Sequence, residues 1–279
     1  MAAKRRVGSD PVVVVLGGND VASAIAHRLH SAGYPVLVLE SPQPLTVRRG
    51  MAYASAIYEG NITLDGITAR HAQSLDEAAA LLQRRAAIPV MGSSDPAILA
   101  AVRPSVIVDA RMRKKERSAS RVSDAPLVIG LGPGFQAGIE AHVVIETNRG
   151  PDLGRIIMDG EAVAYTGEPI EIAGHRRDRF CYAPTDGIFQ TALDLGSTVE
   201  PGQAVGAVNG QPVVTTLGGI LRGIVKGGLA VAAGTKLADI DPRGDARALT
   251  RISEKAWTIA DAVLGLLRAR GIPPEAAAT

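Results

Sequence analysis

The C-terminal half of the chain contains an internal repeat with a period of 32 residues. Shifted by this period, residues 183–208 overlay residues 215–240, so that glycines and apolar residues coincide. Glycines at turns and apolar residues at the spacing of short strands predict a β-unit that cannot bury its own apolar face. Two such units must therefore pack together. The matched pairs include Gly187 with Gly219, Gly196 with Gly228, Val199 with Val231, Gly202 with Gly234, and Val208 with Ile240.

The half-repeat resembles the barrel-sandwich fold of biotinyl and lipoyl carrier domains. Those domains carry a modifiable lysine in the hairpin between their two halves. Here the hairpin reads Asn209-Gly210-Gln211-Pro212-Val213-Val214 and contains no lysine. We therefore expect a smaller all-β barrel-sandwich domain over residues 181–243, built from half-repeats 183–208 and 215–240, that carries neither biotin nor lipoate.

The N-terminal half begins with the pattern of a βαβ unit. Residues 12–16 form an apolar run typical of a buried parallel strand, and residues 21–31 have the apolar spacing of a helix. A second apolar run, residues 35–40, ends at Glu40. These elements predict an α/β Rossmann-like parallel-sheet domain over residues 1–150. Residues 61–69 are expected to form a short strand pair, residues 151–180 a linker, and residues 244–279 a C-terminal helix followed by a disordered tail from residue 273.

The turn after the first strand is a degenerate dinucleotide-binding fingerprint. Asn19 stands where the middle glycine of the fingerprint normally allows the backbone to approach a pyrophosphate. The amides of the helix N-terminus are still expected to favour an anion, and Glu40 lies where an acid that binds ribose is expected. The predicted ligand-binding residues of this region are Gly17, Gly18, Asn19, Asp20, Ser23 and Glu40.

Three further groups follow predicted strands and are candidates for the same crevice. Arginines can bind a phosphate or carboxylate with two hydrogen bonds, and successive glycines can turn backbone N–H groups toward an anion. Open α/β sheets place ligands at the carboxyl ends of their strands. These candidates are Arg48 and Arg49, the loop Gly132, Pro133, Gly134 and Phe135, and the polar group Glu146, Thr147 and Arg149. The basic segment of residues 111–121 is either a solvated loop or a lid.

Composition excludes several classes of protein. A net charge of +2, from 30 basic and 28 acidic residues, gives no general attraction to nucleic acid or anionic lipid. No stretch approaches the roughly 20 apolar residues of a membrane span, and no secretory signal pattern is present. One cysteine, Cys181, excludes an internal disulfide, and no metal-binding motif is found. We expect a cytoplasmic protein that contacts neither membrane nor nucleic acid.

Several segments together resemble the YqeB-type accessory proteins of the selenium-dependent molybdenum hydroxylase system. The resemblance implies a Rossmann-type domain joined to a carrier-like β-domain, with a role in maturation or cofactor supply for molybdenum hydroxylases. It also implies that Asp20, Ser23, Arg48, Arg49, the Gly132–Phe135 loop and residues 146–149 bind a ligand. The matching segments are residues 17–60, 125–138, 142–150, 153–157, 183–189 and 236–244.

The leading hypothesis is a maturation factor that binds an anionic ligand in the Rossmann-like crevice. That ligand would be a nucleotide, a molybdopterin-type cofactor or an intermediate that carries selenium or sulfur. The partner would be a molybdenum hydroxylase or another of its maturation factors, and the chain could form oligomers. Two alternatives remain open: an NAD(P)-dependent oxidoreductase, and a non-catalytic scaffold that binds proteins. No catalytic residue is assigned.

Overall fold

A computed structural model describes residues 12–113 and 116–274 of the chain. Residues 275–279, at the end of the predicted tail, and Lys114 and Lys115 of the basic segment lie outside this described part. The chain divides into two compact units. The first comprises the described residues of Met1–Pro42, Tyr53–Tyr165 and Ile252–Thr279, and the second comprises Gln43–Ala52 and Thr166–Arg251.

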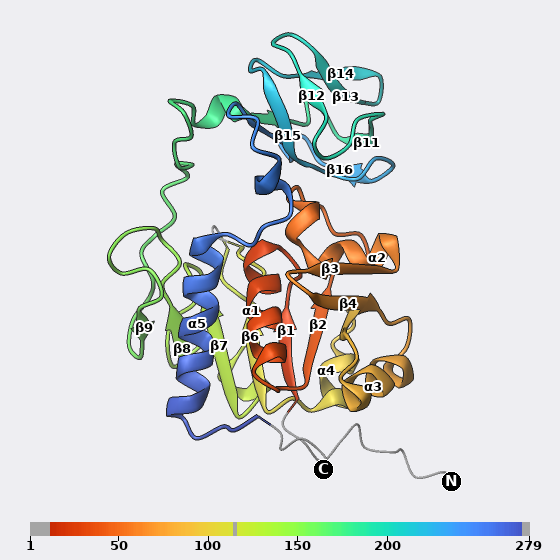
Figure 1. Cartoon of the computed structure of the whole chain (residues 1–279). Helices are drawn as coiled ribbons and strands as arrows, with labels where there is room; N and C mark the ends of the chain where they lie inside the picture. The colour runs from red at the N-terminus through yellow and green to blue at the C-terminus, as the bar shows by residue number, and fades with distance from the viewer. Residues whose placement is uncertain (1–11, 114–115, 275–279) are drawn as a thin grey trace. The chain divides into compact units, whose positions relative to one another are not determined.

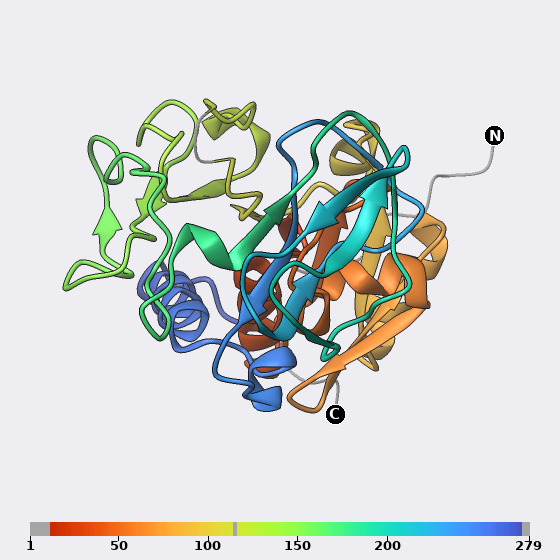
Figure 2. The same cartoon turned by 90° about the horizontal axis from the view of Figure 1, so that it is seen from above.

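The first unit is built on a nine-stranded mixed sheet. Its inner strands are parallel, whereas the two edge strands, β3 and β9, pair antiparallel with their neighbours. Figures 1 and 2 show these edges on opposite sides of the unit, in orange and in green. In spatial order the strands are β3 (Asn61–Leu64), β4 (Ile67–His71), β5 (Ile88–Gly92), β2 (Val36–Glu40), β1 (Val13–Leu16), β6 (Val106–Asp109), β7 (Leu127–Leu131), β8 (Val143–Ile145) and β9 (Ile156–Ile157).

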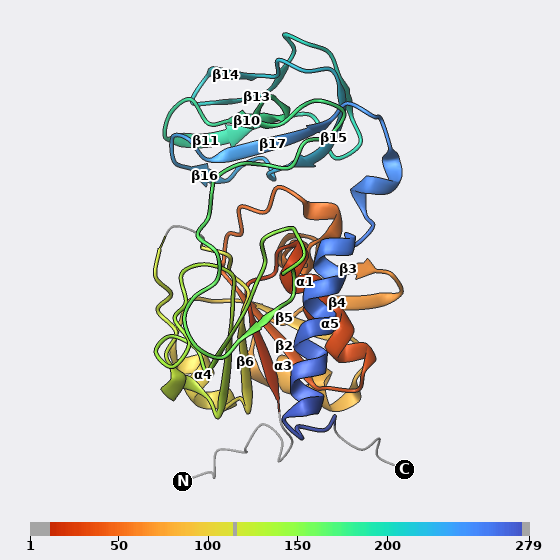
Figure 3. The same cartoon turned by 90° about the vertical axis from the view of Figure 1, so that its left-hand side faces the viewer.

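Helices cover both faces of this sheet and create two cores. Helices α1 (Asp20–Ser31) and α5 (Glu254–Ala269) lie side by side on one face (Figures 1 and 3), where Val13 and Val15 are buried. On the other face, α3 (Leu75–Arg84) and α4 (Ala97–Val102) pack in the core that contains Val14 and Leu16. Alternate side chains of a strand point to opposite faces, so a strand covered on both sides must be apolar throughout.

The helix ends are fixed by short polar side chains. Asn19, Ser74 and Ser253 cap α1, α3 and α5 by accepting hydrogen bonds from backbone N–H groups of the first turn. The rest of the first unit contains a single-turn helix, α2 (Ala56–Glu59), and the 3-10 turns Tyr53–Ser55 and Val122–Asp124.

The second unit contains two four-stranded antiparallel sheets, which Figure 3 shows with most of their strands labelled. The first has the order β10 (Phe180–Tyr182), β17 (Lys236–Asp241), β15 (Gly219–Ile224) and β12 (Thr198–Val199). The second has the order β14 (Gln211–Val214), β13 (Ala204–Val208), β11 (Gly187–Gln190) and β16 (Ala230–Val231). Three 3-10 turns complete the unit: Arg49–Met51, Arg177–Arg179 and Ala246–Leu249.

Strand pairing confirms the 32-residue repeat. Gly187 of β11 pairs with Val231 of β16, and the equivalent pair 32 residues away joins Gly219 of β15 to Val199 of β12. Each half-repeat therefore supplies a strand to the sheet of the other half. The repeated glycines also share positive φ angles: +152° and +146° for Gly187 and Gly219, +82° and +88° for Gly196 and Gly228, and +85° and +77° for Gly202 and Gly234.

The fold class expected from the sequence is wrong. The first unit is not a Rossmann-like parallel-sheet domain, because its sheet is mixed: the hairpin of residues 61–71 turns at Asp65-Gly66 and joins the sheet through β4, and β9 returns along β8. The second unit is not a single barrel-sandwich domain but contains two distinct antiparallel sheets. Short edge strands such as β9, with two residues, carry too little periodicity to be recognised in a sequence.

Within the described part of the chain, no helix has the length and apolar character that crossing a bilayer requires.

Gly219 occupies the same position in its half-repeat as Gly187 does in the other. A substitution at Gly219 tests whether the fold requires glycine there. A Cβ atom there would overlap the carbonyl oxygen of Asp241, and the residue has a φ of +146°. We expect Gly219→Ala to lower the free energy of unfolding by about 3 kcal/mol, since backbone strain and a backbone overlap combine. Gly228→Ala is the control: its φ is +88° but nothing lies near the new Cβ, so a loss of about 1 kcal/mol is expected. Urea unfolding followed by circular dichroism measures the stability of both variants. Equal losses would show that the overlap with Asp241 does not add to the cost at Gly219.

Candidate functional site

The turn after β1 is occupied by the side chain of Asn19. Its Oδ1 accepts hydrogen bonds from the backbone N–H groups of Val21 at 3.0 Å and Ala22 at 3.1 Å. Its Nδ2 donates to the carbonyl oxygen of Ala110 at 2.8 Å. These are the helix N-terminal amides that an anion would use, so the asparagine side chain stands in place of a pyrophosphate. Asp20 is half-buried at the first position of α1.

The neighbouring predicted residues also have partners within the protein. The backbone N–H of Gly18 donates to Oε2 of Glu40 at 2.7 Å, while Oε1 of Glu40 accepts from the N–H of Ser41 at 2.6 Å. The buried Ser23 hydroxyl donates to the Gly18 carbonyl at 3.1 Å and accepts from the N–H of Tyr53 at 2.7 Å. Glu40 and Ser23 therefore brace the turn.

Strand order reverses between β1 and β6, the position where open α/β sheets normally bind a ligand. The turn after β1 and the segment after β6 touch at this point. A Cβ atom on Gly17, which has a φ of +96°, would lie 3.1 Å from the carbonyl oxygen of Ala110. Together with the bond from Asn19 to Ala110, this close approach joins the two segments at the point where the sequence predicts the ligand.

The glycine loop after β7 is shaped by packing. Phe135 is buried against Gly130, whose position would not accept a Cβ atom, and Gly132, with a φ of +71°, lies against the Thr147 hydroxyl. Gly134, with a φ of +97°, accepts a hydrogen bond from the N–H of Ser118 at 2.9 Å, and Pro133 is half-buried. The positive φ angles expected from the sequence are present, and the absence of a side chain at these glycines lets neighbouring segments approach closely.

The polar group after β8 is organised by Glu146, which is fully buried. Its Oε1 accepts from the N–H groups of Thr147 and Asn148 at 2.8 Å and 2.7 Å, and its Oε2 accepts from the N–H of Val163 at 2.7 Å. A buried carboxylate satisfied by backbone donors fixes the loop around it. Arg149 is exposed.

Arg48 and Arg49 belong to the second unit. Arg48 donates to the carbonyl of Ala248 at 3.2 Å and to the sulfur of Met51 at 3.0 Å. Arg49 donates to the carbonyl of Ile224 at 2.7 Å and forms an ion pair with Asp194 at 2.6 Å. Arg49 thus attaches residues 43–52 to β15, and Arg48 attaches them to the 3-10 turn Ala246–Leu249.

A cavity of about 1100 Å³ lies in the first unit beside α4, on the face of the sheet to which Leu16 and Leu39 point. Of the predicted binding residues, all of which the structure describes, Glu40 lines this cavity. Six serines and a mixture of charges give the wall its polarity. The polar lining residues are Ser41, Ser93, Ser94, Ser105, Ser120 and Ser123, the acids Glu40, Asp95 and Asp124, and the arginines Arg103, Arg111 and Arg113.

The buried carboxylate of Asp109, at the end of β6, organises one wall of the cavity. Nε and Nη2 of Arg111 donate to it at 2.8 Å and 2.5 Å, and the hydroxyls of Ser118 and Ser120 donate at 2.7 Å and 2.8 Å. Burial alone would raise the pKa of Asp109, but the bonds from Arg111 and the two serines outweigh it and hold this pKa below its usual value. The basic segment is thus tied to the sheet at Arg111, Ser118 and Ser120.

Most of the residues that line the cavity were not predicted from the sequence. The run Ser93-Ser94-Asp95 directly follows a buried strand, which is the same signal that selected Glu146, and could have been recognised. Arg103 has no such signal, because it lines the cavity from the C-terminal end of α4.

Donors and acceptors in this wall suit a polar organic ligand with a negatively charged group. Arginines bind carboxylates and phosphates, and serine hydroxyls both donate and accept. Among the described residues, no group of three or more His, Cys, Asp or Glu side chains is arranged to hold a metal ion.

The Asp109 network makes a prediction about stability and pH. Asp109→Asn leaves the half-buried Arg111 guanidinium without its carboxylate, and we expect a loss of about 3 kcal/mol near neutral pH. Because the pKa of Asp109 is lowered on folding, its contribution is complete above its ordinary value of 3.8 and is lost as the pH falls through the lower folded-state pKa. The difference between wild type and variant should therefore shrink below about pH 4.

Urea unfolding at a series of pH values measures this difference. Asp159→Asn, at an exposed aspartate, is the control and should change stability by less than about 0.5 kcal/mol. A pH-independent cost at position 109 would show that the carboxylate charge is not responsible.

Comparison with known proteins gives one close sequence relative and several distant structural neighbours. No protein-family model matches the chain. The ectoine utilization protein EutE (DoeB) from Ruegeria pomeroyi, in its product-bound structure, is 15% identical over 84% of this chain and 85% of its own, with a TM-score of 0.25. The succinylglutamate desuccinylase/aspartoacylase from Rhodobacter sphaeroides is 15% identical over 84% and 85%, with a TM-score of 0.24. At these TM-scores the likeness does not define the fold.

The sequence relative is YqeB of Escherichia coli (strain K12), which is described as an uncharacterized protein. It is 41% identical over 256 residues, which make up 92% of this chain and 47% of YqeB. The chain thus spans about half the length of the relative that it matches. Identity at this level over 92% of the chain makes it similar to about half of YqeB and supports the resemblance to YqeB-type proteins.

Proposed function

We propose that the chain is an accessory protein that binds an anionic small molecule in the cavity of the first unit. The observation that carries the proposal is the cavity itself, with three arginines and six serines on its wall. Its volume of about 1100 Å³ is slightly larger than the range typical of small-molecule sites. The cavity borders the switch point that the sequence predicts as the binding position, because Leu16, Glu40 and Arg111 line it.

The three arginines of the cavity differ in their surroundings, and this difference supports an anionic ligand. Arg111 is held by Asp109 and stiffens the wall, whereas Arg103 and Arg113 line the cavity and are exposed. Glu40 and the serines offer hydrogen bonds for the rest of a polar ligand. A molybdopterin-type cofactor or a nucleotide has both a negatively charged phosphate and a heterocycle rich in hydrogen-bonding groups.

We propose further that this binding serves the maturation of a molybdenum hydroxylase in the cytoplasm. Support comes from the ordered sequence motifs shared with YqeB-type accessory proteins, including residues 125–138, 142–150 and 236–244. The chain would hold the cofactor or an intermediate that carries selenium or sulfur, and would deliver it to the hydroxylase or to another maturation factor.

Ligand binding to the cavity can be tested at its two exposed arginines. We expect pterin nucleotides to bind the wild-type chain and the double variant Arg103→Gln/Arg113→Gln to bind at least about tenfold more weakly, because two charge-assisted contacts are lost. Isothermal titration calorimetry measures the affinity. Arg84→Gln, at an exposed arginine of α3 outside the cavity, should bind like wild type.

Two results would argue against the proposal: no binding of any pterin nucleotide or NAD(P) to the wild-type chain, or binding that survives the double variant unchanged. Reduced hydroxylase activity in cells that carry the double variant, with the Arg84→Gln chain fully active, would support the role in maturation. Intact maturation in those cells would favour a protein-binding scaffold.

A substitution at Asn19 distinguishes the NAD(P)-dependent oxidoreductase alternative from our proposal. If NAD(P) used the N-terminus of α1, then Asn19→Gly would free the amides of Val21 and Ala22 and should raise NAD(P) affinity at least about tenfold. Our proposal expects no gain, because the N–H of Gly18 remains bound to Glu40. Calorimetric titration of NADH and NADPH into both chains measures the difference.

A further inference from the structure

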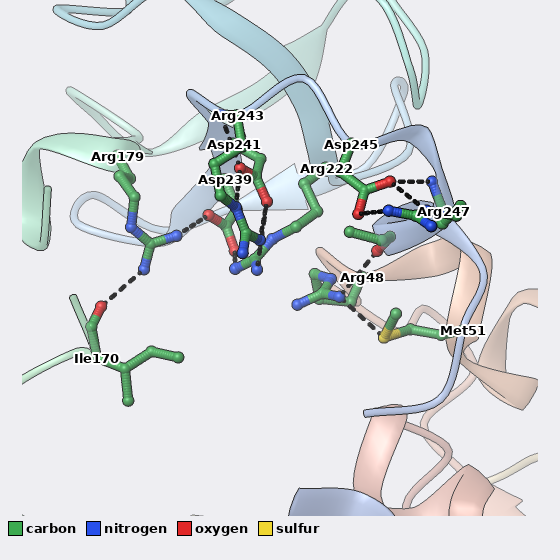
Figure 4. Close-up of polar contacts among 11 residues, drawn as sticks. Arg48, Met51, Ile170, Arg179, Arg222, Asp239, Asp241, Arg243, Asp245 and Arg247 are labelled. Atoms are coloured by element: carbon green, nitrogen blue, oxygen red, sulfur yellow. Dashed lines mark hydrogen bonds and ion pairs between the residues drawn. The ribbon is translucent and has the colours of Figure 1, made fainter. Parts of the chain in front are cut away.

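A partly buried cluster of charges lies in the second unit on the sheet that contains β15 and β17. Arg222 of β15 donates to Oδ2 of Asp239 at 2.6 Å, and Arg179 donates to Oδ1 of the same carboxylate at 2.8 Å. Nζ of Lys236 lies 3.7 Å from Oδ2 of Asp239. Figure 4 shows Arg179 and Arg222 converging on Asp239. One carboxylate thus faces three cations.

The second carboxylate of the region is already engaged. The carboxylate of Asp241 accepts two hydrogen bonds from the Arg243 side chain, at 2.9 Å and 2.6 Å, and one from the Arg243 backbone N–H at 3.0 Å. It lies 3.9 Å from Arg222 (Figure 4). Arg48 contributes a further positive charge that acts on Lys236. Positive charge therefore exceeds negative charge by three among Arg48, Arg179, Arg222, Lys236, Arg243, Asp239 and Asp241 (five cations against two anions).

The internal repeat indicates that the β-unit does not need these charges. The positions 32 residues before Arg222, Lys236, Asp239 and Asp241 are Gln190, Ala204, Ala207 and Asn209, all of them neutral. Those positions lie in or directly beside the equivalent strands β11 and β13. The same strand arrangement therefore forms with and without such a cluster of charges.

The arginines are buried while the lysine reaches solvent. The Arg179 side chain is 1% exposed and that of Arg222 is 11% exposed, and Nε of each is buried without a hydrogen-bond partner. Lys236 is 33% exposed, and its Nζ lies 3.3 Å from the centre of the Phe180 ring. Concentrated positive charge of this kind, beside a lysine side chain that is one-third exposed, attracts an anion.

We propose that Lys236 and Arg222 form a binding site for an oxyanion group, a carboxylate or phosphate of a small molecule, on the second unit. Asp239 orients both cations, and Arg179 and Arg48 supply the surrounding positive potential. This site is separate from the cavity of the first unit and does not depend on the function proposed for that cavity.

Lys236 makes the binding sensitive to pH. Burial and the charges of Arg222, Arg179 and Arg48 lower its pKa to about 8, although Asp239 acts in the opposite direction. The ammonium form attracts an anion and the neutral amine does not. Binding should therefore be strong below the pKa and weaken as the pH rises through it, and a bound anion should in turn raise the pKa.

Sulfate is the probe for this site, because its charge stays constant between pH 6 and pH 10. We expect sulfate to shift the amide NMR signals of β15 and β17, with an affinity that falls at least about tenfold across pH 7–9.5 at constant ionic strength. Lys236→Gln should weaken binding at pH 7 at least about tenfold and abolish its pH dependence. Lys236→Arg should restore binding and keep it constant across this range, because arginine remains charged.

Arg247→Gln is the matched control. Its side chain is 84% exposed, pairs with Asp245 in the same unit, and should leave sulfate affinity unchanged. If Lys236→Gln does not fold, Lys236→Arg and the wild-type pH profile still decide the question. Equal sulfate binding by wild type and Lys236→Gln, a flat wild-type profile, or shifts that lie away from β15 and β17 would each overturn the proposal.

Discussion

Burial of strand β1 on both faces is the constraint around which the first unit is arranged. Four consecutive apolar residues pair with β2 on one side and β6 on the other, and helices cover both surfaces. A parallel strand at this position brings the turn after β1 close to the segment after β6. The Asn19 side chain fills that meeting point and joins the two segments. The polar cavity beside α4 borders this point, because Leu16 at the end of β1 and Arg111 after β6 both line it.

Asp109 and Asp239 are two buried carboxylates that differ in the balance of charge around them. Asp109 faces one guanidinium and two hydroxyls, so its charge is balanced and the segment after β6 is fixed. Asp239 faces Arg179, Arg222 and Lys236, so positive charge remains in excess. Removing one partner of a balanced buried pair destabilises a fold, whereas an excess of one sign near the surface attracts a ligand of the other sign.

Sequence periodicity predicted the central elements and the repeat but not the fold class. The opening strand and helix, the C-terminal helix and the 32-residue repeat are all present, and the strand pair predicted over residues 61–69 is present as β3 and β4. The expected Rossmann-like and barrel-sandwich classes are wrong, because edge strands such as β9 and the division of the second unit into two sheets depend on long-range pairing. Local patterns do not determine which distant strands will meet.

The site was harder to predict than the strands. Glycines and polar residues after strands were recognised as special, and positive φ angles occur at Gly17, Gly132 and Gly134. Their partners, however, are protein groups: Ala110, Thr147 and Glu116 occupy the space in front of these glycines. Whether a glycine faces a ligand or another segment is decided by tertiary packing, which a single sequence does not record. Arg103 lines the cavity from the end of α4, and its position depends on how that helix packs on the sheet.

Exchange of strands between the half-repeats has a consequence for how such a unit could have arisen. Each half contains a strand that only the other half can pair, and the two exchanges are equivalent under a shift of 32 residues. A single half presents a self-complementary surface, which is the geometry of a twofold homodimer. Fusion of two copies into one chain preserves that dimer while freeing each copy to change by itself. Charged side chains at 222, 236 and 239, opposite neutral ones at 190, 204 and 207, are the kind of asymmetry that an obligate homodimer of identical halves could not have held.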